Sequence, residues 1–219
     1  MSKTINNPGF IVLEGMDGAG KGVQSRMLCA AMKAAGLDVI LTREPGGSPG
    51  AEQIRSLIVE GNVDRWDDMT ELLLIYAARR SHIVQTIKPA LDKGTWVISD
   101  RFADSSRAFQ GVAGNLGLET VENIHGEVVG DFTPDLTLIL DLDPAISLDR
   151  ADARGGNEDR FEQKGLAYQQ RVREGFCALA ASTPDSRILV DASGSIGAVS
   201  NEIITAVNTH FDLALEEAE

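Results

Sequence analysis

The stretch Phe10-Ile-Val-Leu-Glu-Gly-Met-Asp-Gly-Ala-Gly-Lys-Gly-Val23 decides the fold. It begins with the apolar run Phe10 to Leu13, which is typical of a strand buried on both faces. A glycine-rich segment follows and closes on Lys21, and from Val23 onward apolar residues recur at helical spacing. Strand, glycine loop and helix in this order form the context that a phosphate-binding loop requires.

Each residue type in this loop suits an anion. Glycines let the backbone approach a phosphate closely, and the following helix adds the positive end of its dipole. Lys21 supplies a mobile positive charge for the outer phosphates. The last motif position departs from the pattern, because Gly22 stands where a Ser or Thr hydroxyl normally ligates magnesium. We predict that phosphates bind to Gly15, Met16, Asp17, Gly18, Ala19, Gly20, Lys21 and Gly22.

The composition limits the classes of protein that the chain can belong to. With 219 residues and 43% hydrophobic content, it is expected to form one domain over residues 1–219. A net charge of −13 argues against nucleic-acid binding, and the longest apolar runs are only strand length, which argues against a membrane span. The two cysteines, Cys29 and Cys177, fall on apolar helix positions and indicate buried thiols of a reducing, cytoplasmic compartment.

Short apolar strands alternate with helices along the chain, which predicts an α/β fold with a parallel sheet of five strands covered on both faces. The expected strands are 10–13, 38–42, 95–99, 136–140 and 187–190. Residues 101–116 are predicted to form a loop or a broken helix, and 196 to about 215 a closing helix. Ligands of such sheets bind beyond the carboxyl ends of the strands. Polar segments lie at these ends, at 15–21, 43–47, 100–101 and 141–143.

Arginines gather in the loops and helices expected at that edge: Arg43, Arg55, Arg79, Arg101, Arg154 and Arg160. Guanidinium groups pair bidentately with phosphate, so this set would form a local positive basin on an acidic protein. Arg154 and Arg160 flank a glycine-rich segment, which we interpret as a lid at about residues 152–163. Asp100, at the end of a strand, is the candidate ligand for Mg²⁺ or its water shell.

Longer motifs resemble those of the thymidylate kinases over nearly the whole chain. Thr-Arg-Glu-Pro-Gly-Gly is the most specific of them, and the phosphate loop alone is not specific. The segments that carry the resemblance are Leu13-Glu-Gly-Met-Asp-Gly-Ala-Gly-Lys21, Thr42-Arg-Glu-Pro-Gly-Gly47, Tyr76-Ala-Ala-Arg79, Ile87-Lys-Pro-Ala-Leu91, Asp100-Arg-Phe102, Ala108-Phe-Gln-Gly111, Pro134-Asp-Leu-Thr-Leu138, Asp159-Arg-Phe-Glu162 and Val190-Asp-Ala-Ser193. Because the arginines lie in the lid and none lies in the phosphate loop, the chain is similar to the bacterial subtype with lid arginines.

The resemblance implies a P-loop nucleoside monophosphate kinase fold, ATP as phosphate donor, Mg²⁺, and usually a homodimer. It implies that Lys21, Arg101, Arg154, Arg160 and Asp17 are catalytic. Asp17 would lie near the sugar and the acceptor phosphate. The remaining implied contacts to the monophosphate come from Glu44, Pro45, Arg55, Ile75, Arg79, Arg101, Ser105, Ser106, Phe109 and Gln110.

Three departures from the family pattern leave alternatives open. Gly22-Val23 lacks the usual hydroxyl pair, Ile75 stands where a phenylalanine commonly stacks on thymine, and Phe109 replaces a tyrosine. The resemblance implies ATP-dependent conversion of dTMP to dTDP by in-line transfer. Ile75 and Phe109 favour, as an alternative, a kinase for another nucleoside monophosphate. The Gly22-Val23 pair motivates a second alternative, a nucleotide-binding switch that turns over poorly, but the lid arginines and Asp100-Arg101 argue against it.

Overall fold

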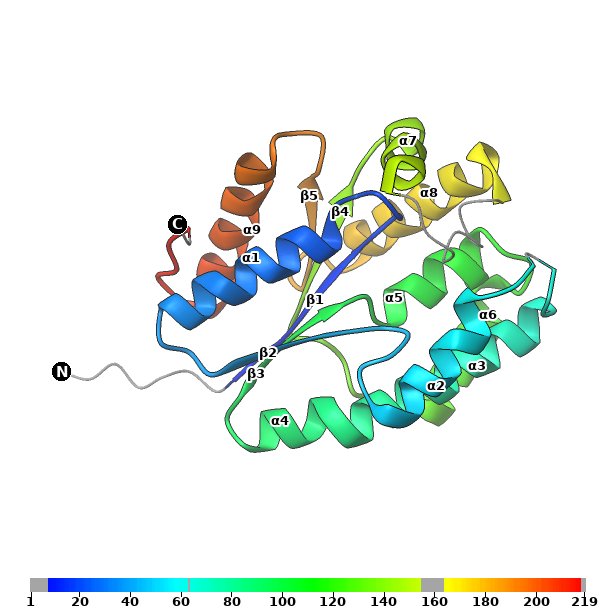
Figure 1. Cartoon of the computed structure of the whole chain (residues 1–219), viewed down its shortest axis with the longest axis horizontal. Helices are drawn as coiled ribbons and strands as arrows, with labels where there is room; N and C mark the ends of the chain where they lie inside the picture. The colour runs from blue at the N-terminus through cyan, green and yellow to red at the C-terminus, as the bar shows by residue number, and fades with distance from the viewer. Residues whose placement is uncertain (1–7, 63, 155–163, 218–219) are drawn as a thin grey trace.

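The computed structural model describes residues 8–62, 64–154 and 164–217. Its centre is a parallel five-stranded sheet with the order β2-β3-β1-β4-β5 (Figure 1). The strands are β1 Phe10–Gly15, β2 Val39–Arg43, β3 Trp96–Asp100, β4 Leu136–Asp141 and β5 Arg187–Asp191. The predicted parallel sheet of five strands is confirmed, with each strand extending to within one or two residues of its expected bounds.

Helices cover both faces of the sheet (Figure 1). One face carries α1 Lys21–Ala34 and α9 Ile196–Phe211. The opposite face carries α3 Asp68–His82, α4 Lys88–Asp92, α5 Ala103–Ser106, α6 Gly117–Val128 and α8 Leu166–Ser182. Helix α2 Pro49–Val59 packs on α3, and α7 Pro144–Arg154 follows β4. Two π-helical turns, η1 Ile83–Ile87 and η2 Arg107–Val112, continue α3 and α5. The segment 101–116 is therefore a broken helix, one of the two forms expected for it.

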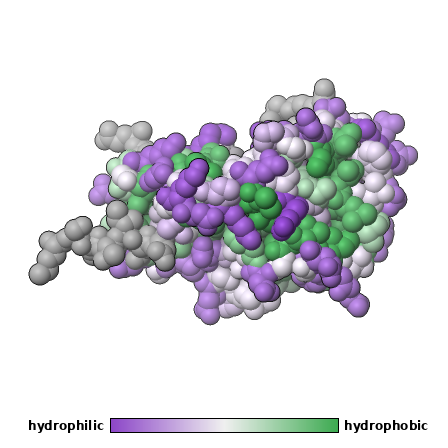
Figure 2. Space-filling model, turned by 90° about the horizontal axis from the view of Figure 1, so that it is seen from below, coloured by the Kyte–Doolittle hydropathy of each residue, from purple (hydrophilic) through white to green (hydrophobic). Residues whose placement is uncertain are grey.

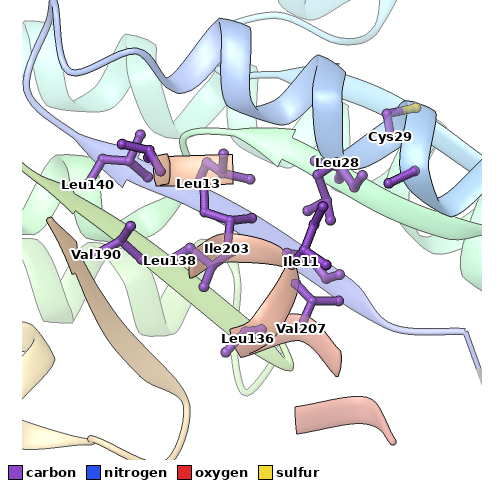
Figure 3. Close-up of a cluster of buried hydrophobic side chains, with 14 of the residues drawn as sticks. Ile11, Leu13, Leu28, Cys29, Leu136, Leu138, Leu140, Val190, Ile203 and Val207 are labelled. Atoms are coloured by element: carbon purple, nitrogen blue, oxygen red, sulfur yellow. The ribbon is translucent and has the colours of Figure 1, made fainter. Parts of the chain in front are cut away.

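Strand β1 divides the apolar core between the two faces. Ile11 and Leu13 pack with α1 and α9, whereas Phe10 and Val12 belong to the cluster on the other face. Figure 3 shows the first cluster, in which side chains of β1 and β4 meet Ile203 of α9. Because successive side chains of a strand point to opposite faces, a continuous apolar run such as this one requires cover on both sides.

Two sequence-based expectations need correction. The closing helix ends at Phe211, one turn before Leu215, because Asp212 adopts the left-handed conformation (φ 52°) and the Asn208 side chain bonds the backbone of Leu215. Cys177 is partly exposed rather than buried, although both cysteines are free thiols as expected. Among the described helices, none combines the length and apolar character needed to cross a bilayer.

The sheet core gives a direct test of this packing. Leu138 on β4 is fully enclosed, so Leu138→Ala is expected to lower the free energy of unfolding by about 3 kcal/mol, through lost burial and the cavity left behind. Leu189 on the neighbouring strand is 43% exposed, so Leu189→Ala should cost less than about 1 kcal/mol. Urea unfolding followed by circular dichroism measures both, and equal losses would contradict the assigned core.

Candidate functional site

The phosphate loop between β1 and α1 has the backbone that its glycines predict. Gly15, Gly18 and Gly20 have φ angles of 133°, 82° and 94°, which side-chain-bearing residues rarely adopt. A Cβ atom at Gly18 would also collide with the backbone oxygen of Ser147 in α7. The Ser147 hydroxyl donates to the carbonyl oxygen of Asp17 and fixes the loop from the same side.

Lys21 lies folded over this loop. Its Nζ donates to the carbonyl oxygen of Met16 at 2.6 Å, and its side chain is buried. Burial, together with the nearby positive charge of Arg101, lowers the pKa of Lys21 to about 8, against the opposing charges of Asp17, Asp100 and Glu14. The ammonium is thus held at the place where outer phosphates of a nucleotide would need a positive charge.

Asp100 lies beside Gly22, the residue that stands where the phosphate-loop motif has a Ser or Thr hydroxyl. A Cβ atom at Gly22 would lie 3.4 Å from Oδ2 of Asp100. Within the described residues, no group of three His, Cys, Asp or Glu side chains has the geometry of a metal site. Mg²⁺ commonly uses one or two carboxylates, waters and substrate phosphates, so a single carboxylate beside a phosphate loop suits this ion.

Arg101 connects the end of β3 to the phosphate loop. Its Nη1 donates to the Gly15 carbonyl at 2.9 Å and to Oγ of Ser105 at 3.0 Å, and its Nη2 donates to Oδ1 of Asp17 at 2.7 Å. Its guanidinium carbon lies 5.2 Å from the centre of the Phe109 ring. The backbone of Arg101 is left-handed (φ 74°), which is uncommon for a residue with a side chain. The site therefore imposes a special conformation on the residue predicted to bind the acceptor phosphate.

A second arginine, Arg79 of α3, is enclosed in a buried network. Its Nε donates to Oε2 of Glu44 at 2.7 Å, its Nη1 to Oγ of Ser106 at 3.0 Å, and its Nη2 to the carbonyl of Phe102 at 2.9 Å. His82 lies 3.0 Å from the other Glu44 oxygen, and these contacts together with the charge of Arg79 lower the pKa of Glu44 against the effect of burial. Arg79 is 1% exposed, so its guanidinium is rigidly oriented.

The other predicted substrate residues surround these two arginines. Arg55 donates to the carbonyl of Pro45 at 2.7 Å, and Gln110 donates to the buried carboxylate of Glu71 at 2.9 Å. Phe109 is buried and contacts the rings of Tyr168 and Phe176. Ile75 is half-buried on α3, in the residue before Tyr76.

The predicted arginine basin is only partly described. Arg43 is exposed and pairs with Glu52 at 3.2 Å, so it lies at the edge and outside the buried network. Arg160 and most of the expected lid lie outside the described residues, and Arg154 is the last residue of α7.

Sequence reasoning assigned no role to two residues of this network, Glu14 and His82. Glu14 is fully buried at the end of β1 and accepts three hydrogen bonds from Phe102 and Ser105. His82 connects Glu44 to the hydroxyl of Thr42, which lies 2.7 Å from its Nε2. The sequence pattern that could have pointed to Glu14 is a charged residue directly after an apolar strand. For His82 the only such pattern is its spacing of three residues from Arg79 on one helix, which is weak evidence for a shared site.

Comparison with known proteins agrees with this site. The family model described as thymidylate kinase matches residues 13–203. The thymidylate kinase of Caulobacter vibrioides is 50% identical over 198 residues, which cover 90% of this chain and 95% of that protein. The thymidylate kinase of Jannaschia sp. is also 50% identical, over 200 residues that cover 91% and 96% of the two chains.

A solved structure extends the likeness to three dimensions. The crystal structure of thymidylate kinase from Ehrlichia chaffeensis superimposes with a TM-score of 0.74 at 31% identity, and the match covers 92% of this chain and 99% of that one. The phosphate loop, the Arg101 and Arg79 networks and these matches lead to one conclusion: the chain belongs to the thymidylate kinase family.

Proposed function

We propose that this protein transfers the γ-phosphoryl group of ATP to dTMP and forms dTDP. One observation supports this proposal most directly. Lys21, Asp17 and Arg101 lie close together at the carboxyl ends of β1 and β3, in a chain of the thymidylate kinase family. Residues Gly15 to Gly22 would hold the phosphates of ATP, and Arg101 with Arg55 would hold the phosphate of dTMP. All of these residues would belong to one kinase domain over residues 1–219.

The arrangement favours catalysis by alignment and charge neutralisation. The acceptor is itself a phosphate, whose second pKa near 6 leaves it largely dianionic at neutral pH, so it needs no general base. Arg101 orients this acceptor while Lys21 offsets charge on the donor. We propose that Arg154 and Arg160, in a lid at about residues 152–163, add positive charge at the transferring group.

Thymine would bind against α3 and the turn after β3. Glu44 and Pro45 shape the pocket wall, and Arg79 is held in one orientation by Glu44 and Ser106. Ile75 supplies an apolar surface, while Phe109 packs beside Arg101. Ser105, Ser106 and Gln110 would complete the contacts to base and sugar. Because buried carboxylates hold both Arg79 and Gln110 in one orientation, these donors would be preorganised for a planar base.

Magnesium is proposed to bind through Asp100 and its hydration shell. When bound, the ion neutralises charge on the outer phosphates of the donor. Oδ2 of Asp100 faces Gly22, which has no side chain to offer a ligand. This carboxylate would therefore act directly or through water, in place of the hydroxyl that the phosphate loop lacks.

We further propose a cytoplasmic homodimer whose partners are nucleotides, without nucleic acid or membrane binding. Figure 2 views the molecule from the side of α2, α3 and α4 and shows apolar residues gathered over α2 and α3. Leu73 and Val84 are 52% and 49% exposed, and Leu57 of α2 is 38% exposed. A second copy of this chain would cover this apolar surface, which otherwise faces water.

The proposed reaction is tested by ADP release with ATP, Mg²⁺ and a panel of nucleoside monophosphates. We expect dTMP to give the highest kcat/KM. Faster turnover of another monophosphate would mean that Ile75 and Phe109 have changed the specificity, and no turnover with any of them would contradict the kinase.

The role of Arg101 is tested by substitution. Arg101→Ala should lower kcat/KM for dTMP by about 100-fold, the loss expected for a charge-assisted phosphate contact. The exposed Arg65→Ala serves as its control.

The magnesium assignment is tested at Gly22. Gly22→Thr restores a hydroxyl in a place that has room for a Cβ atom, so it should lower the Mg²⁺ concentration for half-maximal activity. A gain of ~1 kcal/mol corresponds to about fivefold. Gly22→Ala adds the Cβ atom without the hydroxyl and is the matched control. Identical magnesium titrations for the two variants would exclude this position from the ion's surroundings.

The proposed dimer is tested by sedimentation at micromolar concentration. Leu73→Glu places a charge in the apolar surface and should convert the dimer into a monomer. Leu189→Glu alters a leucine of similar exposure on β5 and should leave the dimer intact. A wild-type protein that sediments as a monomer would overturn the proposal.

A further inference from the structure

Glu14 is a buried acid that the proposed reaction does not use directly. It lies in β1 between Leu13 and Gly15, with no exposed surface. Its Oε1 accepts hydrogen bonds from the backbone nitrogens of Phe102 at 2.8 Å and Ser105 at 3.0 Å, and its Oε2 accepts from the Ser105 hydroxyl at 2.6 Å. A buried carboxylate is retained only where such donors compensate its lost hydration.

Ser105 links this carboxylate to Arg101. A serine hydroxyl carries one proton, and donation of this proton to Glu14 leaves the oxygen lone pairs to accept from Nη1 of Arg101 at 3.0 Å. The same guanidinium then reaches Asp17 through Nη2. Glu14 thus fixes the direction of the hydroxyl, and the hydroxyl fixes one edge of the guanidinium.

Glu14 also holds the backbone on the carboxyl side of Arg101. The left-handed Arg101 is fixed on one side by its own N–H, which donates to the Leu13 carbonyl at 2.9 Å. On the other side, the next N–H in the chain, that of Phe102, donates to Glu14. A conformation of this kind persists only when its surroundings determine it from several directions.

We propose that Glu14 is a positioning residue for the acceptor phosphate, because it holds Arg101 through Ser105 and through the backbone of Phe102. This inference rests on the proposed role of Arg101 in binding the monophosphate. Glu14 itself touches neither nucleotide in this mechanism. Its effect reaches the reaction through the orientation of one guanidinium group.

The charge of Glu14 is unfavourable for stability, which separates the proposed role from a purely structural one. Burial, together with the negative charge of Asp104 on α5, raises the pKa of Glu14 to about 7, against the opposing effects of Arg101 and of the hydrogen bonds from Ser105 and Phe102. Lys21 of α1 and Arg79 of α3 also act on this charge. Between pH 4.5 and 7 the folded protein therefore binds more protons at Glu14 than the unfolded chain, so this contribution to stability is lost as pH rises.

The test compares Glu14→Gln with wild type in kinetics and in stability. The amide would donate to Ser105 and compete with Arg101, so we expect kcat/KM for dTMP to fall about 10- to 100-fold, with KM for ATP nearly unchanged. As pH rises from 5.5 to 8, Tm should fall less in the variant than in wild type, because the amide of Gln has no proton to lose in this range. Unaltered kinetics in a folded Glu14→Gln variant would overturn the proposal.

Two further variants keep the test decisive. Ser105→Ala leaves the two backbone donors on Glu14 and removes the hydroxyl link to Arg101, so it should lower kcat/KM for dTMP even if Glu14→Gln fails to fold. Because Ser105 is also proposed to contact the nucleotide, the part of this loss that acts through Arg101 is the part that disappears in an Arg101→Ala background. In an Arg101→Ala background, Glu14→Gln should add no further loss, and fully additive losses would contradict action through Arg101. Glu122→Gln, which removes the outer partner of Arg107, is the matched control with normal kinetics expected.

The inference can fail independently of the proposed reaction. Calorimetric titration with dTMP measures the Arg101 contact without any turnover, and Glu14→Gln should weaken this binding about tenfold if the contact depends on Glu14. An inactive wild type that binds dTMP would refute the kinase and still report on Glu14. An active wild type with a kinetically normal Glu14→Gln variant would refute only the inference.

Discussion

The turn Phe102 to Ser106 is held from two sides by two buried carboxylates, and the geometry of the site depends on this constraint. Glu14 of β1 accepts from the N–H of Phe102, while Arg79, itself fixed by Glu44, donates to the Phe102 carbonyl. Both carboxylates are almost completely buried, so each needs its donors in place to offset lost hydration. Arg79 cannot move without leaving the buried carboxylate of Glu44 uncompensated. The rigidity of the site therefore follows from the energetics of buried charge.

The fold was predictable because its signals are local in sequence. The apolar run at Phe10 to Leu13 specifies a strand buried on both faces, and the alternation of such runs with helices specifies a parallel sheet. The position of polar segments at strand ends then placed the site at one edge of the sheet. The end of α9 was less predictable, because a left-handed Asp212 and the Asn208 contacts to Leu215 stop the helix within an apolar stretch.

The contacts within the site were not predictable in the same way. Motif residues such as Arg79 and Arg101 were identified, but their partners come from distant parts of the chain: Glu44 lies 35 positions from Arg79, and Asp17 lies 84 positions from Arg101. His82 and Glu14 matter only because the fold brings them to these partners. Spacing along one helix or strand carries little information about such pairs, since three-dimensional packing decides them.

The expectation of a positive basin on an acidic protein also changes once these pairs are known. Arg79 and Arg101 are each bonded to a carboxylate, so the local positive potential is smaller than the number of arginines suggests. What the pairs provide instead is orientation. A guanidinium already held by Asp17 and Ser105 would lose little freedom on donating to the proposed acceptor phosphate, and this would lower the entropic cost of binding. Asp17 would also repel the incoming anion, so discrimination for a correctly placed phosphate would arise from the same pair that orients Arg101.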